Sequence, residues 1–127
     1  MPHMTARVPE AQLAGREPAL ITALTEAVVE VYGEWARDLV VVQLDGIPPG
    51  RWGIGGQVAD DAAPAITFGI REAALARRGG REIAARLVAR LTDAVVGVLG
   101  EQARGGTSVE LVATPAGRSG IGGAISA

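Results

Sequence analysis

The reactive side chains in this sequence are few, and their types restrict the chemistry that it could do. All 12 basic residues are arginine, cysteine is absent, and His3 and Tyr32 are the only histidine and the only tyrosine. There is therefore no lysine for a Schiff base, no thiolate nucleophile and no disulfide. A zinc site needs three or four suitable ligands, so one histidine makes a metal cofactor improbable. A Ser-His-Asp triad would have to use His3 near the terminus. The remaining candidates for a catalytic base are a carboxylate and the amine of the chain's own N-terminus.

The composition excludes several other classes of protein. The 127 residues carry a net charge of −2, and 48% of them are hydrophobic. This charge is small and of the wrong sign for binding nucleic acid. No apolar run approaches the ~20 residues of a membrane span, and no signal peptide opens the chain. We therefore expect a cytoplasmic protein without nucleic-acid or membrane partners.

The sequence contains an internal repeat. Residues 24–34 recur as residues 91–101, and the glycine-rich residues 50–56 recur as residues 117–123, both at an offset of 67. The beginnings of the two copies match at an offset of 62, so the second copy has about five additional residues near 76–80. Two segments that keep one offset indicate a duplicated unit.

The repeat predicts the domain organisation. We expect one domain over residues 1–127, made of two units at 1–58 and 64–127 and joined through residues 57–63. Each unit is predicted to contain a strand, a helix, a second strand and a short glycine-rich hairpin.

The hydrophobic pattern predicts the elements of each unit. Apolar residues at helical spacing run from Leu20 to Val31 and from Ile83 to Val98, and Gly33 and Gly100 stand where helices end. The predicted strands are residues 2–8, 39–44, 64–71 and 108–113. A helix that connects two strands makes them parallel. The expected fold is α/β (α+β): two fused β-α-β units form a four-stranded mixed sheet with two helices on one face. The bare opposite face favours oligomerisation.

Several motifs resemble those of the tautomerase superfamily, in particular its fused, duplicated form related to 4-oxalocrotonate tautomerase. They are Met1-Pro2, residues 9–13, residues 25–28 and the segment Ile-Pro-Pro-Gly-Arg-Trp-Gly-Ile-Gly-Gly at 47–56. The resemblance covers both halves. It implies a tautomerase-like fold, assembly as a homotrimer, no cofactor, and a catalytic Pro2 exposed by removal of Met1.

Physical chemistry agrees with a basic Pro2. An N-terminal proline is a secondary amine, and a reference terminal amine titrates near ~8. An apolar pocket and nearby arginines both disfavour its protonated form and move the pKa toward neutrality, where a base works best. Pro64, its counterpart in the second unit, is a mid-chain amide and cannot act as a base. We therefore expect one active site per chain.

The resemblance also suggests substrate-binding residues. Arg71 resembles the substrate arginine of the cis-3-chloroacrylic acid dehalogenase subgroup, and Trp52 matches the aromatic wall of the family's pocket. Arginine can hold a carboxylate through two parallel hydrogen bonds. Arg51 and Arg118, in the two hairpins, could reach the site of a neighbouring subunit, although an exposed loop position explains them as well.

The sequence departs from the family pattern at several positions. Gln12 and Val41 stand where short members of the family usually have arginine. Val28 replaces the helix histidine of the dehalogenases, and Gly120 and Ile121 occupy the neighbourhood of their water-activating glutamate. These differences disfavour hydration and dehalogenation, whereas proton transfer needs only the proline and a partner for the substrate's negative charge.

We therefore expect an isomerase that moves a proton between the enol and keto forms of a small 2-hydroxy-dienoate or 2-oxo acid. Two alternatives remain at this stage. One is a lyase of the same superfamily, such as a hydratase, dehalogenase or decarboxylase. The other is a non-catalytic oligomeric binding protein, which the missing first-half arginines favour. A pocket enlarged for a bulkier ketone is a weaker possibility.

Overall fold

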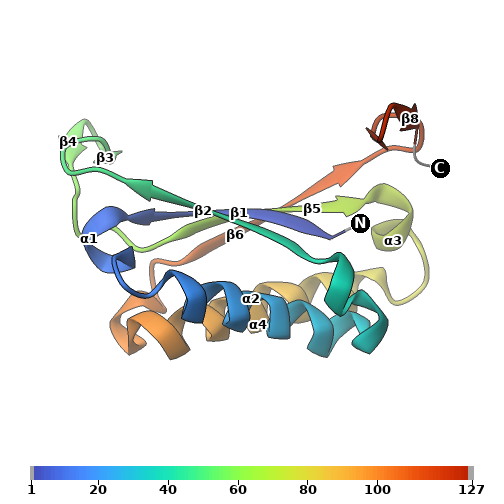
Figure 1. Ribbon diagram of the computed structural model, residues 1–127, viewed down its shortest axis with the longest axis horizontal. Coiled ribbons are helices and arrows are strands. Elements are labelled where there is room, and N and C mark those ends of the chain that lie inside the picture. Colours follow the sequence, from blue (N-terminus) through green and yellow to red (C-terminus); the bar gives the residue numbers. More distant parts are fainter. Residues whose placement is uncertain (1, 126–127) are drawn as a thin grey trace.

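The computed structural model describes residues 2–125, which form two layers (Figure 1). One layer is a four-stranded sheet with the order β2-β1-β5-β6. The strands are β1 (His3–Pro9), β2 (Val41–Ile47), β5 (Ala65–Arg71) and β6 (Ser108–Thr114). Strands β1 and β2 are parallel, as are β5 and β6, whereas β1 and β5 run antiparallel. The predicted mixed sheet is confirmed.

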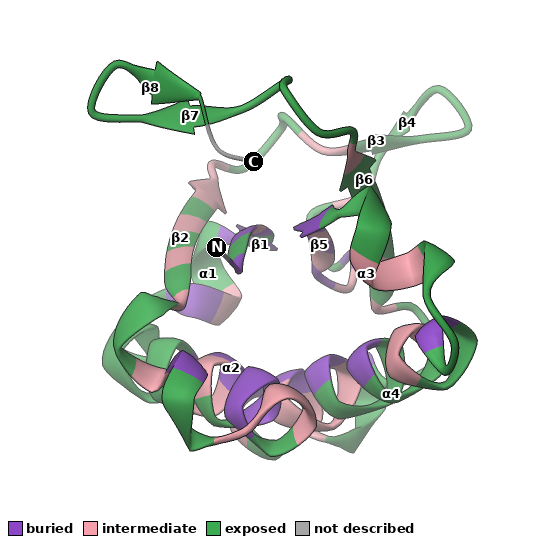
Figure 2. Cartoon of the chain, turned by 90° about the vertical axis from the view of Figure 1, so that its right-hand side faces the viewer, coloured by how far each residue is buried: buried purple, intermediate pink, exposed green. Residues whose placement is uncertain are grey.

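The second layer consists of two long helices that cover one face of the sheet (Figure 2). They are α2 (Glu17–Tyr32) and α4 (Gly80–Leu99), and they end at the predicted glycines, Gly33 and Gly100. Shorter elements complete the chain: the helices α1 (Glu10–Leu13) and α3 (Glu72–Ala76), the 3-10 helices η1 (Glu34–Leu39) and η2 (Glu101–Ala103), and the strand pairs β3 (Gly53–Ile54) with β4 (Gln57–Val58) and β7 (Gly120–Ile121) with β8 (Ala124–Ile125). No helix within residues 2–125 has the length and apolar character needed to cross a membrane.

The core lies between the sheet and the helices. Alternate residues of the central strands point toward the helix layer and are buried, because successive side chains of a strand face opposite sides. They meet residues at helical spacing on α2 and α4. The fully buried large side chains include Met4, Val8, Ile66 and Phe68 from the sheet and Leu20, Leu24, Val28, Leu87, Leu91 and Val95 from the helices.

The predicted strand at 39–44 begins two residues too early and ends three residues too early. Residues 34–39 form η1 instead, and β2 spans Val41–Ile47. Two side chains hold this 3-10 helix. The indole Nε1 of Trp35 donates to the carbonyl oxygen of Tyr32 (2.7 Å), and Arg37 pairs with Glu34. The chain therefore turns after α2 before it extends, and Leu39 faces a cavity rather than the sheet.

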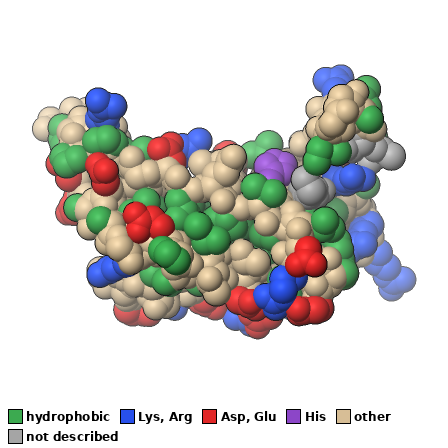
Figure 3. All heavy atoms as spheres, viewed as in Figure 1, with side chains coloured by type: hydrophobic (Ala, Val, Ile, Leu, Met, Phe, Trp, Pro, Cys, Tyr) green, Lys and Arg blue, Asp and Glu red, His purple; other side chains and the backbone are tan. Residues whose placement is uncertain are grey.

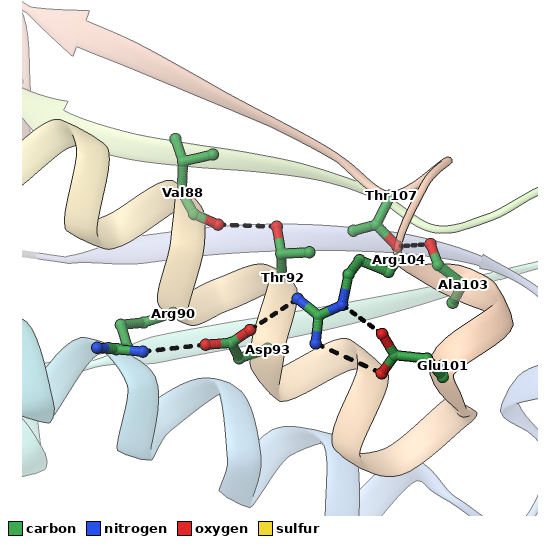
Figure 4. Close-up of polar contacts among 8 residues, drawn as sticks. All are labelled: Val88, Arg90, Thr92, Asp93, Glu101, Ala103, Arg104 and Thr107. Carbon is green, nitrogen blue, oxygen red and sulfur yellow. Dashed lines mark hydrogen bonds and ion pairs between the residues drawn. The ribbon is translucent and has the colours of Figure 1, made fainter.

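The two halves also share their polar contacts at the offset of 67. Arg37 bridges Glu26 and Glu34, and Arg104 bridges Asp93 and Glu101 in the same way (Figure 4). The guanidinium of Arg104 holds the pKa of Asp93 below its usual range. Each cluster links a long helix to the 3-10 helix that follows it. These recurring contacts agree with a duplication, while the domain limits at 1–58 and 64–127 stay a prediction.

The face of the sheet away from the helices is open in the single chain. The hairpins β3–β4 and β7–β8 project on this side, at opposite ends of the sheet (Figure 1). Their side chains are exposed: Ile54 by 60%, Val58 by 63%, Ile121 by 65% and Ile125 by 73%. Figure 3 shows the histidine on the surface between the two projections. Exposed apolar residues on both hairpins are typical of an interface between subunits.

Candidate active site

A cavity of about 550 Å³ lies at the end of the molecule where β1 begins and β5 ends. The sheet, the end of α2, η1, α3 and the beginning of α4 all contribute to it. Most of its wall is apolar or aromatic, and two arginines provide the charge. The lining residues are Pro2, Val31, Tyr32, Trp35, Leu39, Gly69, Ile70, Arg71, Ala74, Arg77 and Ile83.

The sheet topology brings Pro2 and Arg71 to this cavity. Pro2 is buried, and its carbonyl oxygen accepts a hydrogen bond from the backbone N–H of Val41 (3.0 Å), which fixes it beside β2. Arg71 is the last residue of β5. Because β5 runs antiparallel to β1, its carboxyl end lies beside the amino end of β1. Two residues that are 69 positions apart therefore line one cavity.

Trp52 does not line this cavity within its own chain. It follows the carboxyl end of β2, whereas Pro2 precedes the amino end of β1, and these two strands are parallel. Each strand has 7 residues. At ~3.3 Å per residue, Trp52 and Pro2 are therefore separated by roughly 20 Å along the strands. Arg51 lies at the same far end, beside the β3–β4 hairpin.

Two aromatic residues that the sequence analysis did not assign to the site form one wall of the cavity. Tyr32 ends α2 and Trp35 lies in η1; their rings are parallel, with centroids 6.1 Å apart and an interplanar angle of 2°. The ring of Tyr32 also meets Phe68 edge-on, with centroids 6.5 Å apart. This arrangement presents a flat apolar surface to a ligand.

The repeat carried a signal for these two residues. At the offset of 67, Tyr32 corresponds to Leu99 and Trp35 corresponds to Gln102. The backbone frame is the same, since the Nε2 of Gln102 donates to the carbonyl oxygen of Leu99 (2.8 Å) as Trp35 donates to Tyr32. Both ends therefore have the same hydrogen-bonded backbone, but only the end that holds Pro2 has aromatic side chains at these two positions.

The phenol of Tyr32 is held in its neutral form. Burial raises its pKa above the ordinary value, and the nearby Arg77 cation offsets part of this rise because it favours the phenolate. We expect the Arg77→Gln variant to raise the pKa of Tyr32 further. Because Tyr32 is the only tyrosine, the ultraviolet absorbance of phenolate during a pH titration reports this residue alone. The neighbouring Arg78→Gln variant is the control. The same pKa of Tyr32 in both variants would contradict an electrostatic effect of Arg77 on the phenol.

A second, smaller cavity of about 290 Å³ adjoins the first. It shares Gly69, Ile70 and Arg71 with the larger cavity and adds His3 and residues of the β7–β8 hairpin, among them Ser119, Gly120 and Ile121. The imidazole of His3 lies against Gly69, where any Cβ would overlap the ring. Arg71 therefore borders both cavities.

The opposite end of the molecule lacks the corresponding groups. Pro64 occupies the place of Pro2, and its carbonyl oxygen accepts from the N–H of Ser108 (3.1 Å). Pro9 occupies the place of Arg71. Gln12, the counterpart of Ala74, donates its side-chain N–H to the carbonyl oxygen of Ala62 (3.0 Å). The duplication has thus kept the framework at both ends and left Pro2, Arg71 and Arg77 together at one.

The described residues offer no evident place for a metal ion. Between residues 2 and 125, no three or more histidine, cysteine, aspartate or glutamate side chains come together in a suitable group. The polar groups in the larger cavity are guanidinium groups, a phenol and an indole, which suit an anionic organic ligand.

Comparisons with known proteins agree with this architecture. A family model described as tautomerase enzyme matches residues 8–62. The solved structure of a native fused 4-OT is 27% identical, with a TM-score of 0.81, and covers 97% of this chain and 94% of that chain. A wild-type fused 4-OT solved as an asymmetric trimer is 26% identical, with a TM-score of 0.80 and the same coverage of 97% and 94%.

A more distant structure shares the fold alone. A member of the cis-3-chloroacrylic acid dehalogenase family is 20% identical, with a TM-score of 0.77, and the match covers 97% of this chain and 82% of that chain. No curated protein matches the sequence. These comparisons lead to one conclusion: residues 8–62 match the tautomerase family, and nearly the whole chain has the duplicated fold of the fused 4-OT structures.

Proposed function

We propose that this protein is a cofactor-independent isomerase that converts the enol form of a small 2-hydroxy-dienoate or 2-oxo acid into its keto form. The observation that supports the proposal is the cavity in which Pro2 and Arg71 lie together. Pro2 acts as the general base once Met1 has been removed, and Arg71 holds the carboxylate of the substrate.

The proposed mechanism uses one proton carrier. The secondary amine of Pro2 takes the proton from the enol hydroxyl and returns it to carbon, which forms the ketone. The apolar side chains around Pro2 and the two guanidinium groups disfavour the protonated amine, so the base is available near neutral pH. Arg71 binds the carboxylate through two parallel hydrogen bonds and stabilises the negative charge that develops on the adjacent oxygen.

The proposal includes a homotrimer with three active sites in the cytoplasm. The exposed apolar side chains of the β3–β4 and β7–β8 hairpins support an assembly, and a related fused 4-OT was solved as a trimer. Trp52 lies too far from Pro2 of its own chain to contact the same ligand. We therefore assign it to the cavity of a neighbouring subunit, where it would add an aromatic wall.

A lyase is the second candidate, because the fold is shared with a member of the dehalogenase family. The side chains argue against it. Val28 is fully buried in the core, and neither Gly120 nor Ile121 carries a group that could activate water. A non-catalytic binding protein is a third candidate, since Gln12 and Val41 supply no arginine.

The experiment is to follow the ketonisation of 2-hydroxymuconate and of enol phenylpyruvate by ultraviolet absorbance, with product analysis and the molecular mass in solution. We expect turnover of at least one enol, a ketone as the sole product, and the mass of a trimer. Release of chloride or carbon dioxide, or addition of water, from the corresponding haloacrylate, 2-oxo acid or unsaturated acid without ketonisation would favour the lyase. Absence of all these reactions would favour the binding protein.

A further inference from the structure

The turn that joins α3 to α4 places three arginines at the end of the molecule that holds the larger cavity. Arg77, Arg78 and Arg81 are all exposed, and Arg77 also lines this cavity. The turn closes with a hydrogen bond from the N–H of Gly80 to the carbonyl oxygen of Arg77 (3.0 Å). Arg78 and Arg81 therefore follow directly after the cavity wall without being part of it. Figure 3 shows arginine side chains that project from this end of the molecule.

Two glycines fix the course of this turn. Gly79, with φ of 82° and ψ of 0°, has the left-handed conformation that the third position of a type II turn requires. Any side chain at Gly80 would overlap the backbone of Leu75. The additional residues near 76–80 have no counterpart in the first unit. The turn therefore exists only at the end that holds the cavity.

The charges of these arginines are not offset by ion pairs. Arg37 and Arg104 in the helix layer each bridge two carboxylates. Among residues 2–125, by contrast, no acidic side chain pairs with any of the three arginines of the turn. Residues 71–82 contain four arginines and two glutamates, which gives this segment a net charge of +2 in a chain whose total is −2.

This arrangement lowers the stability of the fold. Arginines that lie close together repel one another, and the amino end of a helix carries a partial positive charge that disfavours cations. Arg81 lies in the first turn of α4, a helix of 20 residues, where Glu82 offsets only part of the charge. Local choices that oppose the fold are typical of functional positions. The cluster of arginines therefore calls for a functional explanation.

We propose that Arg78 and Arg81, the entrance arginines, raise the local concentration of small anions at the mouth of the cavity and so speed their binding. Both side chains belong to residues outside the cavity wall, so they act through the electrostatic field rather than through contact with the bound ligand. Charges at the rim of a site change mainly the association rate and its dependence on salt. The inference rests on the proposed function only in that the ligand of the cavity is an acid.

Trp35 provides a reporter for this field. It lines the cavity and is 66% exposed, so a quencher in solution can reach its ring. The chain has two tryptophans, and Trp52→Phe gives a background in which Trp35 alone is observed. The two quenchers are iodide, which is an anion, and acrylamide, which is neutral. Their bimolecular quenching constants for Trp35 measure how often each quencher arrives at the cavity.

The variants reverse one charge or two. They are Arg78→Glu, Arg81→Glu and the double variant Arg78→Glu/Arg81→Glu. Arg16→Glu is the control matched to each single variant, because Arg16 is exposed, lines neither cavity and changes the net charge by the same amount. Arg16 also precedes α2, so the length of this helix separates it from Tyr32 at the cavity.

At ~0.1 M salt, where charges act over ~10 Å, we expect each single entrance variant to lower the iodide constant by about 1.5-fold and the double variant by about two- to threefold. The acrylamide constants, and both constants of Arg16→Glu, should match those of the background protein. The differences should disappear at ~1 M salt, where the screening length is ~3 Å. An unchanged iodide constant in the double variant, an equal decrease with acrylamide, an equal decrease in Arg16→Glu, or an effect that persists at high salt would overturn the proposal.

Quenching requires no reaction, so the same measurements separate this proposal from the proposed function. Charge-dependent quenching without turnover of any enol would leave the entrance arginines in place and refute the isomerase. Turnover together with quenching that the variants do not change would do the reverse. For an enol that is turned over, the double variant should lower kcat/KM at low salt and leave kcat unchanged. A decrease confined to kcat would assign the two arginines to the chemical step and overturn their role at the entrance.

Discussion

Replacing Pro2 with alanine is expected to lower kcat for ketonisation by about 10²- to 10⁴-fold, the contribution typical of a positioned general base. An N-terminal alanine still provides an amine, but a primary one on a flexible residue rather than a secondary amine on a rigid ring. Buried Pro2 is fixed beside β2 through the N–H of Val41, and the substitution removes the ring that keeps its nitrogen in place. Steady-state kinetics on protein with a verified N-terminus measure the effect.

The matched control is Pro64→Ala, which changes the repeat counterpart of Pro2. Pro64 is also buried at the beginning of a central strand, and its carbonyl accepts the equivalent hydrogen bond from Ser108. Its nitrogen is an amide, however, so kcat should be retained by the fraction of this variant that folds. Turnover that survived in Pro2→Ala, or that fell equally in both variants, would refute a catalytic role for the proline.

The Arg71→Gln variant is expected to raise KM by roughly 10- to 100-fold, the range that follows from losing charge-assisted hydrogen bonds to a carboxylate. A smaller decrease in kcat should accompany it if Arg71 also stabilises the charge that develops in the transition state. Arg71→Lys should recover only part of the loss, because an ammonium group cannot form the two parallel hydrogen bonds of a guanidinium.

Arg16→Gln is a suitable control for the loss of one positive charge. Arg16 is exposed, precedes α2 and lies outside the residues that line either cavity. Its kinetic constants should match those of the wild type. If Arg71→Gln behaved like Arg16→Gln, the substrate carboxylate would have to be held elsewhere, and Arg77 would be the next residue to examine.

Much of the fold follows from the sequence because the signals are local. Short segments show the alternation of buried residues along β1 and β5 and the helical spacing along α2 and α4. Because of the repeat, each of these patterns occurs twice in the sequence. The boundary of β2 was wrong for a physical reason. Apolar residues 39–44 satisfy a strand pattern, but contacts of Trp35 and Arg37 stabilise a 3-10 helix before the strand begins.

The candidate site was only partly accessible to sequence analysis. Pro2 and Arg71 were proposed from motifs, and the antiparallel pairing of β1 with β5 explains why they line one cavity. Tyr32, Trp35 and Arg77 were missed because nothing local indicates that the end of α2 and the turn after α3 face the same cavity. The position of these residues around one cavity depends on how the two repeats pack against each other, and this packing cannot be predicted from the sequence of a short segment.

The comparison of the two ends of the molecule gives a physical reason for a single site. Both ends have the same strand and helix framework, with Pro2 and Pro64 in equivalent positions. Only one end combines the additional turn, the aromatic pair and Arg71, whereas the other has Leu99, Gln102 and Pro9. Residues of both halves thus line the candidate site at one end of the molecule, whereas the other end keeps only the shared framework.

The most direct test of the central claim is to identify which atom reacts with an amine-directed acid probe. Wild-type protein is treated with 3-bromopropiolate, digested and examined by mass spectrometry, with and without a competing carboxylate. We predict one adduct per chain, on the nitrogen of an N-terminal peptide that begins at Pro2, and protection by the competing acid. An N-terminal peptide that retains Met1, an adduct at another residue, or labelling that no acid prevents would contradict Pro2 as the base.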